Sequence, residues 1–141
     1  MLALAPSPAH AYCIYNQVKD REVAIEQEEH PDALRNDRRA HLSIPAGGKF
    51  CCEFHQLDCN PTGRENGIVG LGITIAGEPS YACGLADRRE PSVKVTGAGT
   101  IRIQPNPRHT SHPYIARVYT REGKDITGPA GLACLESKKG K

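Results

Sequence analysis

Apolar side chains recur at every second position over much of this 141-residue sequence. In residues 69–75, for example, Val, Leu, Ile and Ile alternate with Gly, Gly and Thr. Shorter alternating runs lie in residues 22–26, 41–44, 50–55, 93–95, 101–103 and 114–118. Because neighbouring side chains of an extended strand point to opposite faces, each run predicts a strand with one apolar face.

Glycine and proline separate these runs, and their abundance argues against helices. The sequence has 14 glycines and 11 prolines, which leaves little room for long helices. The pattern therefore predicts an all-β fold, a single-domain β-sandwich or small barrel of about seven to eight short strands. Residues 97–99 predict a tight hairpin between Val95 and Ile101, and residues 122–124 predict another between Val118 and Ile126. The polar residues 30–40 predict a loop.

The cysteines indicate the compartment and a source of extra stability. The chain has an even number of them: Cys13, Cys51, Cys52, Cys59, Cys83 and Cys134. They predict three disulfides, which persist in oxidising surroundings. Ala9-His10-Ala11 has the small residues that signal peptidase requires. We therefore expect a secreted, extracellular protein, with a signal-peptide remnant or disordered segment in residues 1–11, a disulfide-stapled β domain in residues 12–135 and a basic disordered tail in residues 136–141.

The adjacent pair Cys51-Cys52 carries the most structural information of the six. In a strand, Cys52 would share the core-facing side with Phe50 and Phe54, and Cys51 would point the other way. Adjacent cysteines rarely bond to each other because the small ring strains the peptide between them. We expect this strand to bond with Cys13 and Cys59, in either order, and Cys83 to bond with Cys134.

Metal and thiol chemistry are the alternatives for these cysteines. Cys52, His55 and Cys59, with Cys51 beside them, have spacings that a zinc site could use. Disulfides are the preferred interpretation behind a signal-peptide remnant, and three bridges would leave no thiol to act as a nucleophile. We predict no metal and no cofactor.

Sequence motifs exclude several classes of function. There is no Gly-x-Ser-x-Gly, no His-Glu-x-x-His and no phosphate-binding loop ending in Lys-Ser/Thr. No apolar run is long enough for a transmembrane helix. A net charge of +2 is small for a nucleic-acid-binding protein, so we do not expect that partner. The absence of a catalytic constellation favours a non-catalytic, effector-like protein that binds an unknown extracellular protein or acidic surface.

Two sets of basic residues are candidates for the binding surface. Arg102, Arg117 and Arg121 lie in or beside expected strands and would form a basic face. Residues 104–113 form a proline-stiffened loop that would present Arg108 and His109. Presentation of Arg108 as bait to a protease is an alternative function, that of a protease inhibitor.

The chain also resembles two groups of known proteins. Residues 12–16 (Tyr-Cys-Ile-Tyr-Asn), with Cys51-Cys52 and Asp58-Cys59-Asn60, resemble small secreted cysteine-rich proteins of filamentous fungi, which implies an extracellular role. Residues 114–119 and 126–128 are similar to the later strands of fungal guanyl-type ribonucleases. No histidine falls in residues 126–131, where that family supplies its catalytic acid. This resemblance therefore implies an inactive relative that could still bind RNA.

Overall fold

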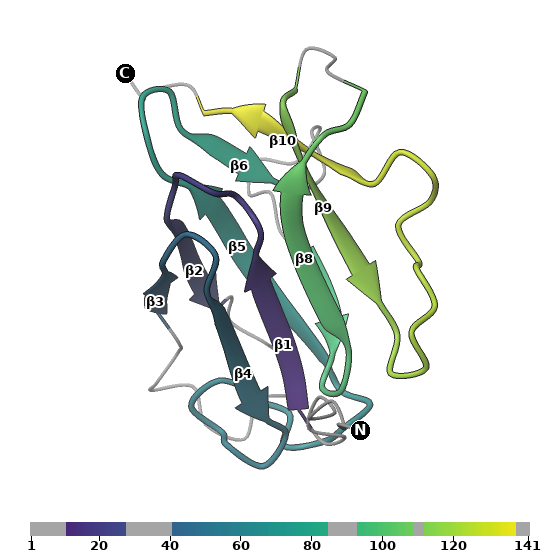
Figure 1. The fold of residues 1–141 in the computed structure, drawn as a ribbon. Coiled ribbons are helices and arrows are strands. Elements are labelled where there is room, and N and C mark those ends of the chain that lie inside the picture. Colours follow the sequence, from purple (N-terminus) through teal and green to yellow (C-terminus); the bar gives the residue numbers. More distant parts are fainter. Residues whose placement is uncertain (1–10, 28–40, 85–92, 109–111, 138–141) are drawn as a thin grey trace, which may run out of the picture.

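The computed structural model describes residues 11–27, 41–84, 93–108 and 112–137, which form ten strands and no helix (Figure 1). The strands are β1 (Ala11–Asn16), β2 (Val23–Gln27), β3 (His41–Ile44), β4 (Lys49–Glu53), β5 (Ile68–Ile75), β6 (Tyr81–Cys83), β7 (Val93–Thr96), β8 (Thr100–Pro105), β9 (Tyr114–Tyr119) and β10 (Leu132–Glu136). The all-β prediction is confirmed, although the described residues contain ten strands instead of about seven to eight.

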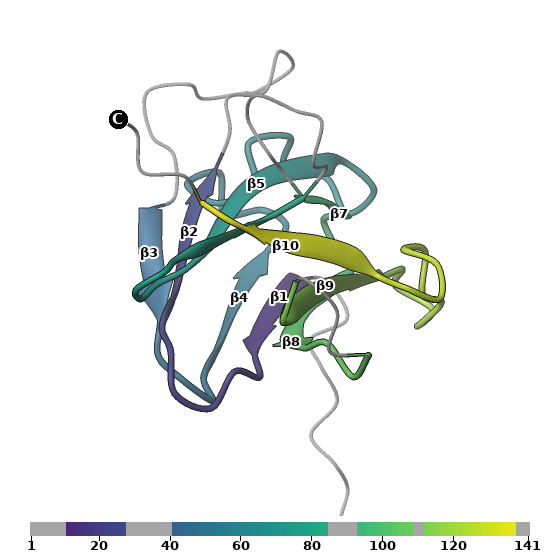
Figure 2. The same cartoon turned by 90° about the horizontal axis from the view of Figure 1, so that it is seen from above.

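All ten strands belong to one hydrogen-bonded sheet, and not to the two separate sheets of a sandwich. The order is β3-β2-β5-β6-β10-β9-β8-β1-β4, and β7 pairs with β5 outside this path. Viewed from above, the strands surround a common interior and nearly close into a barrel (Figure 2). Neighbouring strands run antiparallel except β1 and β8, which are parallel. The small-barrel form of the prediction is thus the one that the structure resembles.

The open seam of this sheet lies between β3 and β4, and the buried side chain of Asn16 spans it. Its Nδ2 donates to the carbonyl oxygens of Arg21 (2.8 Å), Ile44 (3.1 Å) and Pro45 (3.1 Å). Its Oδ1 accepts a hydrogen bond from the N–H of Val18 at 3.0 Å. One amide therefore links backbone groups from β3 and from two turns at this seam.

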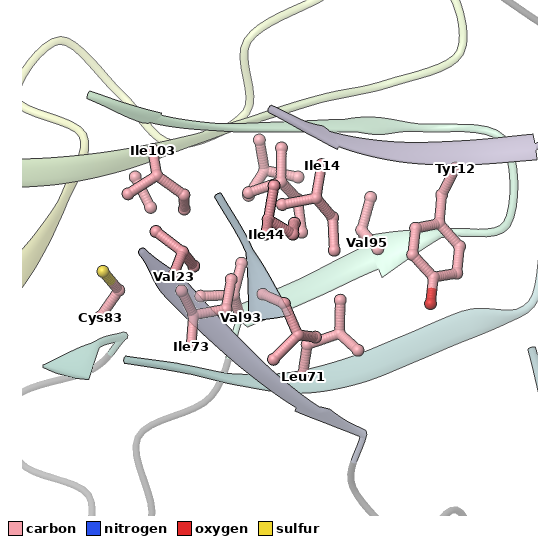
Figure 3. Close-up of a cluster of buried hydrophobic side chains, with 14 of the residues drawn as sticks. Tyr12, Ile14, Val23, Ile44, Leu71, Ile73, Cys83, Val93, Val95 and Ile103 are labelled. Atoms are coloured by element: carbon pink, nitrogen blue, oxygen red, sulfur yellow. The ribbon is translucent and has the colours of Figure 1, made fainter. Parts of the chain in front are cut away.

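The core lies inside the barrel and draws side chains from both of its sides. Ile14 and Ile103 come from β1 and β8, and Ile73 and Leu71 come from β5 on the opposite side (Figure 3). Each is at most 1% exposed, and full burial of such a side chain contributes about 1.5–3 kcal/mol. Tyr12 reaches into the same interior and donates its hydroxyl hydrogen to the carbonyl oxygen of Cys59 at 2.9 Å. Burial raises the pKa of Tyr12 well above its usual range.

Of the two predicted hairpins, one is confirmed and one is wrong. The chain turns back after β9, with a bridge between Tyr119 and Asp125 and a hydrogen bond from the N–H of Ile126 to the carbonyl of Val118. Strands β7 and β8 do not pair with each other: β7 pairs with β5, and β8 pairs with β1 and β9. The turn at residues 97–99 therefore carries the chain from one side of the barrel to the other.

The three disulfides follow the expected pairing. They are Cys13–Cys51, Cys52–Cys59 and Cys83–Cys134, and no cysteine is free. Cys52 is fully buried in the core, whereas Cys51 lies half-buried on the outer face of the same strand, as the alternation predicts. The sulfur atoms that a zinc site at Cys52, His55 and Cys59 would need are therefore committed to disulfides.

Some of the predictions fall outside the described residues. These include the expected N-terminal segment before Ala11, the polar loop in residues 30–40, His109 and the end of the basic tail. At the edges of the described chain, β1 begins at Ala11 and β10 ends at Glu136.

Candidate functional site

The outer face of β4, β1, β8 and β9 brings basic and aromatic side chains together. Lys49 lies opposite Tyr15, Tyr15 lies opposite Arg102, and Arg102 lies opposite Arg117. The alternation explains their direction, because Ile14, Ile101 and Ile103 point into the core and the residues between them must point outward. Arg102 and Arg117, predicted as part of one basic face, are direct cross-strand neighbours.

The Tyr15 ring lies between two cations. The Arg102 guanidinium carbon is 4.6 Å from the ring centroid, and the Lys49 ammonium nitrogen is 5.8 Å from it. Arg102 also lies 6.0 Å from the ring centroid of Tyr119. We call Lys49, Tyr15, Arg102 and Tyr119 the cationic cluster. Each such contact contributes about 0.5–1 kcal/mol at an exposed site and limits the positions that the cation can take.

Arg117 has a different role, because its guanidinium holds the segment after the β9 turn. Its Nη1 donates to Asp125 Oδ2 at 2.9 Å and to the carbonyl of Gly128 at 2.9 Å, and its Nη2 donates to the carbonyl of Pro129 at 2.8 Å. The side chain of Arg117 is only 18% exposed. Most of its donors are therefore used within the protein.

Asp125 completes this structural cluster. Its Oδ1 accepts hydrogen bonds from the N–H and the hydroxyl of Thr127. Partial burial alone would raise the pKa of the Asp125 carboxyl, but the hydrogen bonds from Thr127 and the nearby Arg117 guanidinium outweigh it and lower this pKa below its ordinary value. The carboxylate therefore stays ionised and paired at neutral pH.

Arg121 and Arg108 lie apart from the cationic cluster. Arg121 is exposed and pairs with Glu65, with Nη1 at 3.1 Å from Oε1. Arg108 is exposed, and its backbone is held by the side chain of Asn106. The Oδ1 of Asn106 accepts from the N–H of Arg108 at 3.1 Å, and its Nδ2 donates to the carbonyl of His112 at 2.9 Å. Of the five predicted binding residues, His109 lies outside the described residues, and the structure shows Arg102 and Arg117 as direct cross-strand neighbours.

The outer face of the opposite side of the barrel carries small side chains and an open depression. Ala24, Gly72, Thr74 and Ala82 line it, with Glu26 and His41 as the charged or titratable residues at its edge. Its volume is about 230 Å³. We call it the small-residue depression. It contains no convergent set of polar groups of the kind that orients a small ligand.

The described residues bring no recognisable catalytic or metal-binding group together. Within residues 11–27, 41–84, 93–108 and 112–137, no three His, Cys, Asp or Glu side chains converge in a way that could hold a metal ion. The same residues contain no helix of the length and apolarity that crossing a membrane requires. The geometry that stands out is therefore the cationic cluster.

Tyr15 and Lys49 were not predicted as site residues. Their positions were readable in part, because Tyr15 directly follows the apolar Ile14 and Lys49 directly precedes the alternating run at residues 50–55. The missing information was which strands are neighbours. Strands β1 and β8 are parallel and more than 80 residues apart in the sequence, so alternation alone does not bring Tyr15 beside Arg102.

Comparison of the sequence with protein-family models and with curated proteins, and of the structure with solved structures, finds no match. The functional conclusion therefore depends on the residues themselves.

Proposed function

We propose that this protein is a secreted, non-catalytic binding protein and that the cationic cluster meets its extracellular partner. The main support is the position of Lys49 and Arg102 on either side of Tyr15, on an outward face that the core does not need. The three disulfides suit a protein that works in an oxidising, extracellular space. They also make the strands that carry the cluster rigid, which lowers the entropy lost on binding.

Stability alone does not account for the charges on this face. Like charges directly opposite each other on neighbouring strands are destabilising, and Arg102 lies opposite Arg117. Arg117 is neutralised by Asp125, whereas within the described part of the chain neither Arg102 nor Lys49 takes part in a salt bridge. These two cations are therefore available to a partner.

Titration of the labelled full chain against an extracellular extract tests this proposal. Saturable binding is expected for the unaltered chain, with at least about a tenfold loss in the double variant Lys49→Gln/Arg102→Gln. The matched control, Arg121→Gln/Lys124→Gln, removes the same number of charges from exposed positions and should lose less than about threefold. Equal affinities of the unaltered chain and the Lys49→Gln/Arg102→Gln variant would contradict the proposal. Robust hydrolysis of ester, glycoside or RNA substrates would also contradict it.

A second candidate is protease inhibition through Arg108. The observation that favours it is the side chain of Asn106, which restrains the backbone of the exposed Arg108 and donates to the carbonyl of His112. Titration against a trypsin-like protease would reveal stoichiometric inhibition that Arg108→Ala abolishes. The ribonuclease alternative has less support, because Arg117, the arginine of the resembling strand, is used to hold residues 125–129.

A further inference from the structure

Two features of the cationic cluster restrict the kind of partner that it suits, and this inference rests on the function proposed above. The first is the Tyr15 ring, over which both Lys49 and Arg102 lie. Nucleic-acid bases and neutral sugars bind tyrosine by stacking on an open ring face. Because two cations already lie over this ring, the chemistry that the cluster offers best is N–H donation from two positive groups to anions.

The second feature is the spacing of the two cations. Lys49 and Arg102 lie on β4 and β8, one on each side of β1, so their strands are separated by about 10 Å, twice the usual distance between neighbours. Both side chains face outward from the sheet. A linear polymer with regularly repeated anionic groups can cross such a surface and meet both cations.

Other macromolecules fit these observations less well. A tight protein interface needs an apolar or aromatic centre that becomes fully buried, and the cluster offers none besides its two cation-covered tyrosines. Membrane association needs apolar side chains that enter the lipid. The large hydrophobic residues exposed among the described residues are Ile68 and Ile126, and neither belongs to the cluster.

We propose that the cationic cluster binds an acidic polysaccharide, a linear glycan whose sulfate or carboxylate groups recur every one or two sugars. Lys49 and Arg102 would each take one anionic group, with Arg102 donating through its planar, charge-assisted hydrogen bonds. Tyr15 and Tyr119 orient the cations before the ligand arrives. Their hydroxyl groups can add hydrogen bonds to sugar oxygens at the edges of the rings.

Affinity measurements with defined polymers test this assignment. The full chain is titrated with heparin as a sulfated glycan, polygalacturonate as a carboxylated glycan, neutral dextran, poly(U) and anionic lipid vesicles. We expect saturable binding to heparin or polygalacturonate, none to dextran, and weaker binding to poly(U) and vesicles. Arg102→Gln and Lys49→Gln should each weaken glycan binding by about tenfold or more, whereas Arg121→Gln should change it by less than about threefold.

The outcomes separate this inference from the function on which it rests. Equal losses of glycan affinity in Arg102→Gln and Arg121→Gln would mean that the glycan is attracted only by the net charge of the protein. That result would overturn the glycan site. If poly(U) binds more tightly than either acidic glycan and this binding requires Arg102, the partner is a nucleic acid and the glycan assignment is wrong. If no acidic glycan binds but an extract component still requires Lys49 and Arg102, the glycan assignment fails and the proposed binding function stands. Denaturant midpoints of all variants confirm that each is folded.

Discussion

The two sides of the barrel have similar interiors and very different exteriors. On the side of β4, β1 and β8, outward positions carry Lys49, Tyr15 and Arg102. On the side of β2, β5 and β6, the outward positions of the small-residue depression include Ala24, Gly72 and Ala82. Both sides contribute isoleucine and leucine side chains to the core. Packing in the core thus requires apolar inward-facing side chains on both sides of the barrel. The outward-facing side chains are less constrained by packing and differ between the two sides.

Three joints hold these two sides together. At one boundary the Cys83–Cys134 disulfide connects β6 to β10. At the open seam the amide of Asn16 connects the end of β1 to Ile44 and Pro45. The third joint is the turn at Gly97, between β7 on one side and β8 on the other. If the two sides differ in function but unfold together, substitutions at these joints should lower the free energy of unfolding of the whole domain.

The largest effect is expected from the Cys83–Cys134 joint. This disulfide closes a sequence separation of 51 residues, against 7 for Cys52–Cys59. Chain entropy predicts a loss of about 4 kcal/mol for Cys83→Ala/Cys134→Ala and about 2 kcal/mol for Cys52→Ala/Cys59→Ala. Denaturant unfolding measures both, and a larger loss for the short loop would show that local packing around the buried Cys52 decides instead.

A smaller loss is expected at the seam. Asn16→Ala removes the side-chain donor to the carbonyls of Arg21 and Ile44 and one of the two donors to the carbonyl of Pro45, which should cost about 2–3 kcal/mol. Gln17→Ala is the matched control: its side chain is exposed, and the backbone hydrogen bond of Gln17 to Ile103 is kept. That variant should change the free energy of unfolding by less than about 0.5 kcal/mol. Equal effects of the two substitutions would argue against Asn16 as a joint.

The turn at Gly97 should tolerate no side chain, unlike a glycine of the small-residue depression. A Cβ at Gly97 would lie 2.4 Å from the carbonyl oxygen of Arg64 and 2.7 Å from Nδ2 of Asn60. Gly97→Ala should therefore cost about 1–3 kcal/mol. In Gly72→Ala the new Cβ meets only the carbonyl oxygen of Glu26 at 3.5 Å, and the change should stay within about 0.5 kcal/mol. Thermal unfolding of the two variants compares them directly.

The smallest effect concerns the segment held by Arg117, and it depends on pH. Because the folded-state pKa of Asp125 is lowered, its contribution is present above the unfolded pKa of about 4 and is lost as pH falls through the folded value. We expect up to about 1 kcal/mol, since the ion pair is partly exposed. The N–H of Gly131 donates to the carbonyl of Gly128 at 3.2 Å, and the protection of this amide against hydrogen exchange should fall below about pH 4. In Asp125→Asn this acid response should disappear; its persistence would assign the response to another group.

The sequence predicted strands with one apolar and one polar face. It missed β1, which is buried on both faces, and the very short β6. Strand β5 was read directly from its alternation. Strand β1 was not, because five of its six residues are buried and the alternation is lost. Strand β6 has only three residues, too few for a period to be seen. The opposite directions of Cys51 and Cys52 predicted different partners for them, Cys13 and Cys59 in either order, and the order comes from the structure.

Long-range pairing explains what sequence could not supply for the candidate site. Arg102 was named from its basic strand, but its neighbours depend on the parallel pairing of β1 with β8. The contacts that occupy Arg117 and Arg121 depend on Asp125 and Glu65, the second of which is 56 residues from its partner. The charged residues can be counted in the sequence. The fold decides which of them are neutralised by an ion pair.

The consecutive cysteines of β4 also bear on how errors arise during oxidative folding. A slip of β4 by one residue against β1 would bring Cys52 opposite Cys13 and turn Cys51 toward the interior. Oxidation in the slipped register would join Cys13 to Cys52 and give a disulfide isomer of unchanged mass. Thiol–disulfide exchange would be needed to restore the correct register. Peptide mapping of the Cys13 partner therefore distinguishes correctly aligned molecules from misaligned ones, and the demand for a disulfide isomerase should concentrate on this one strand.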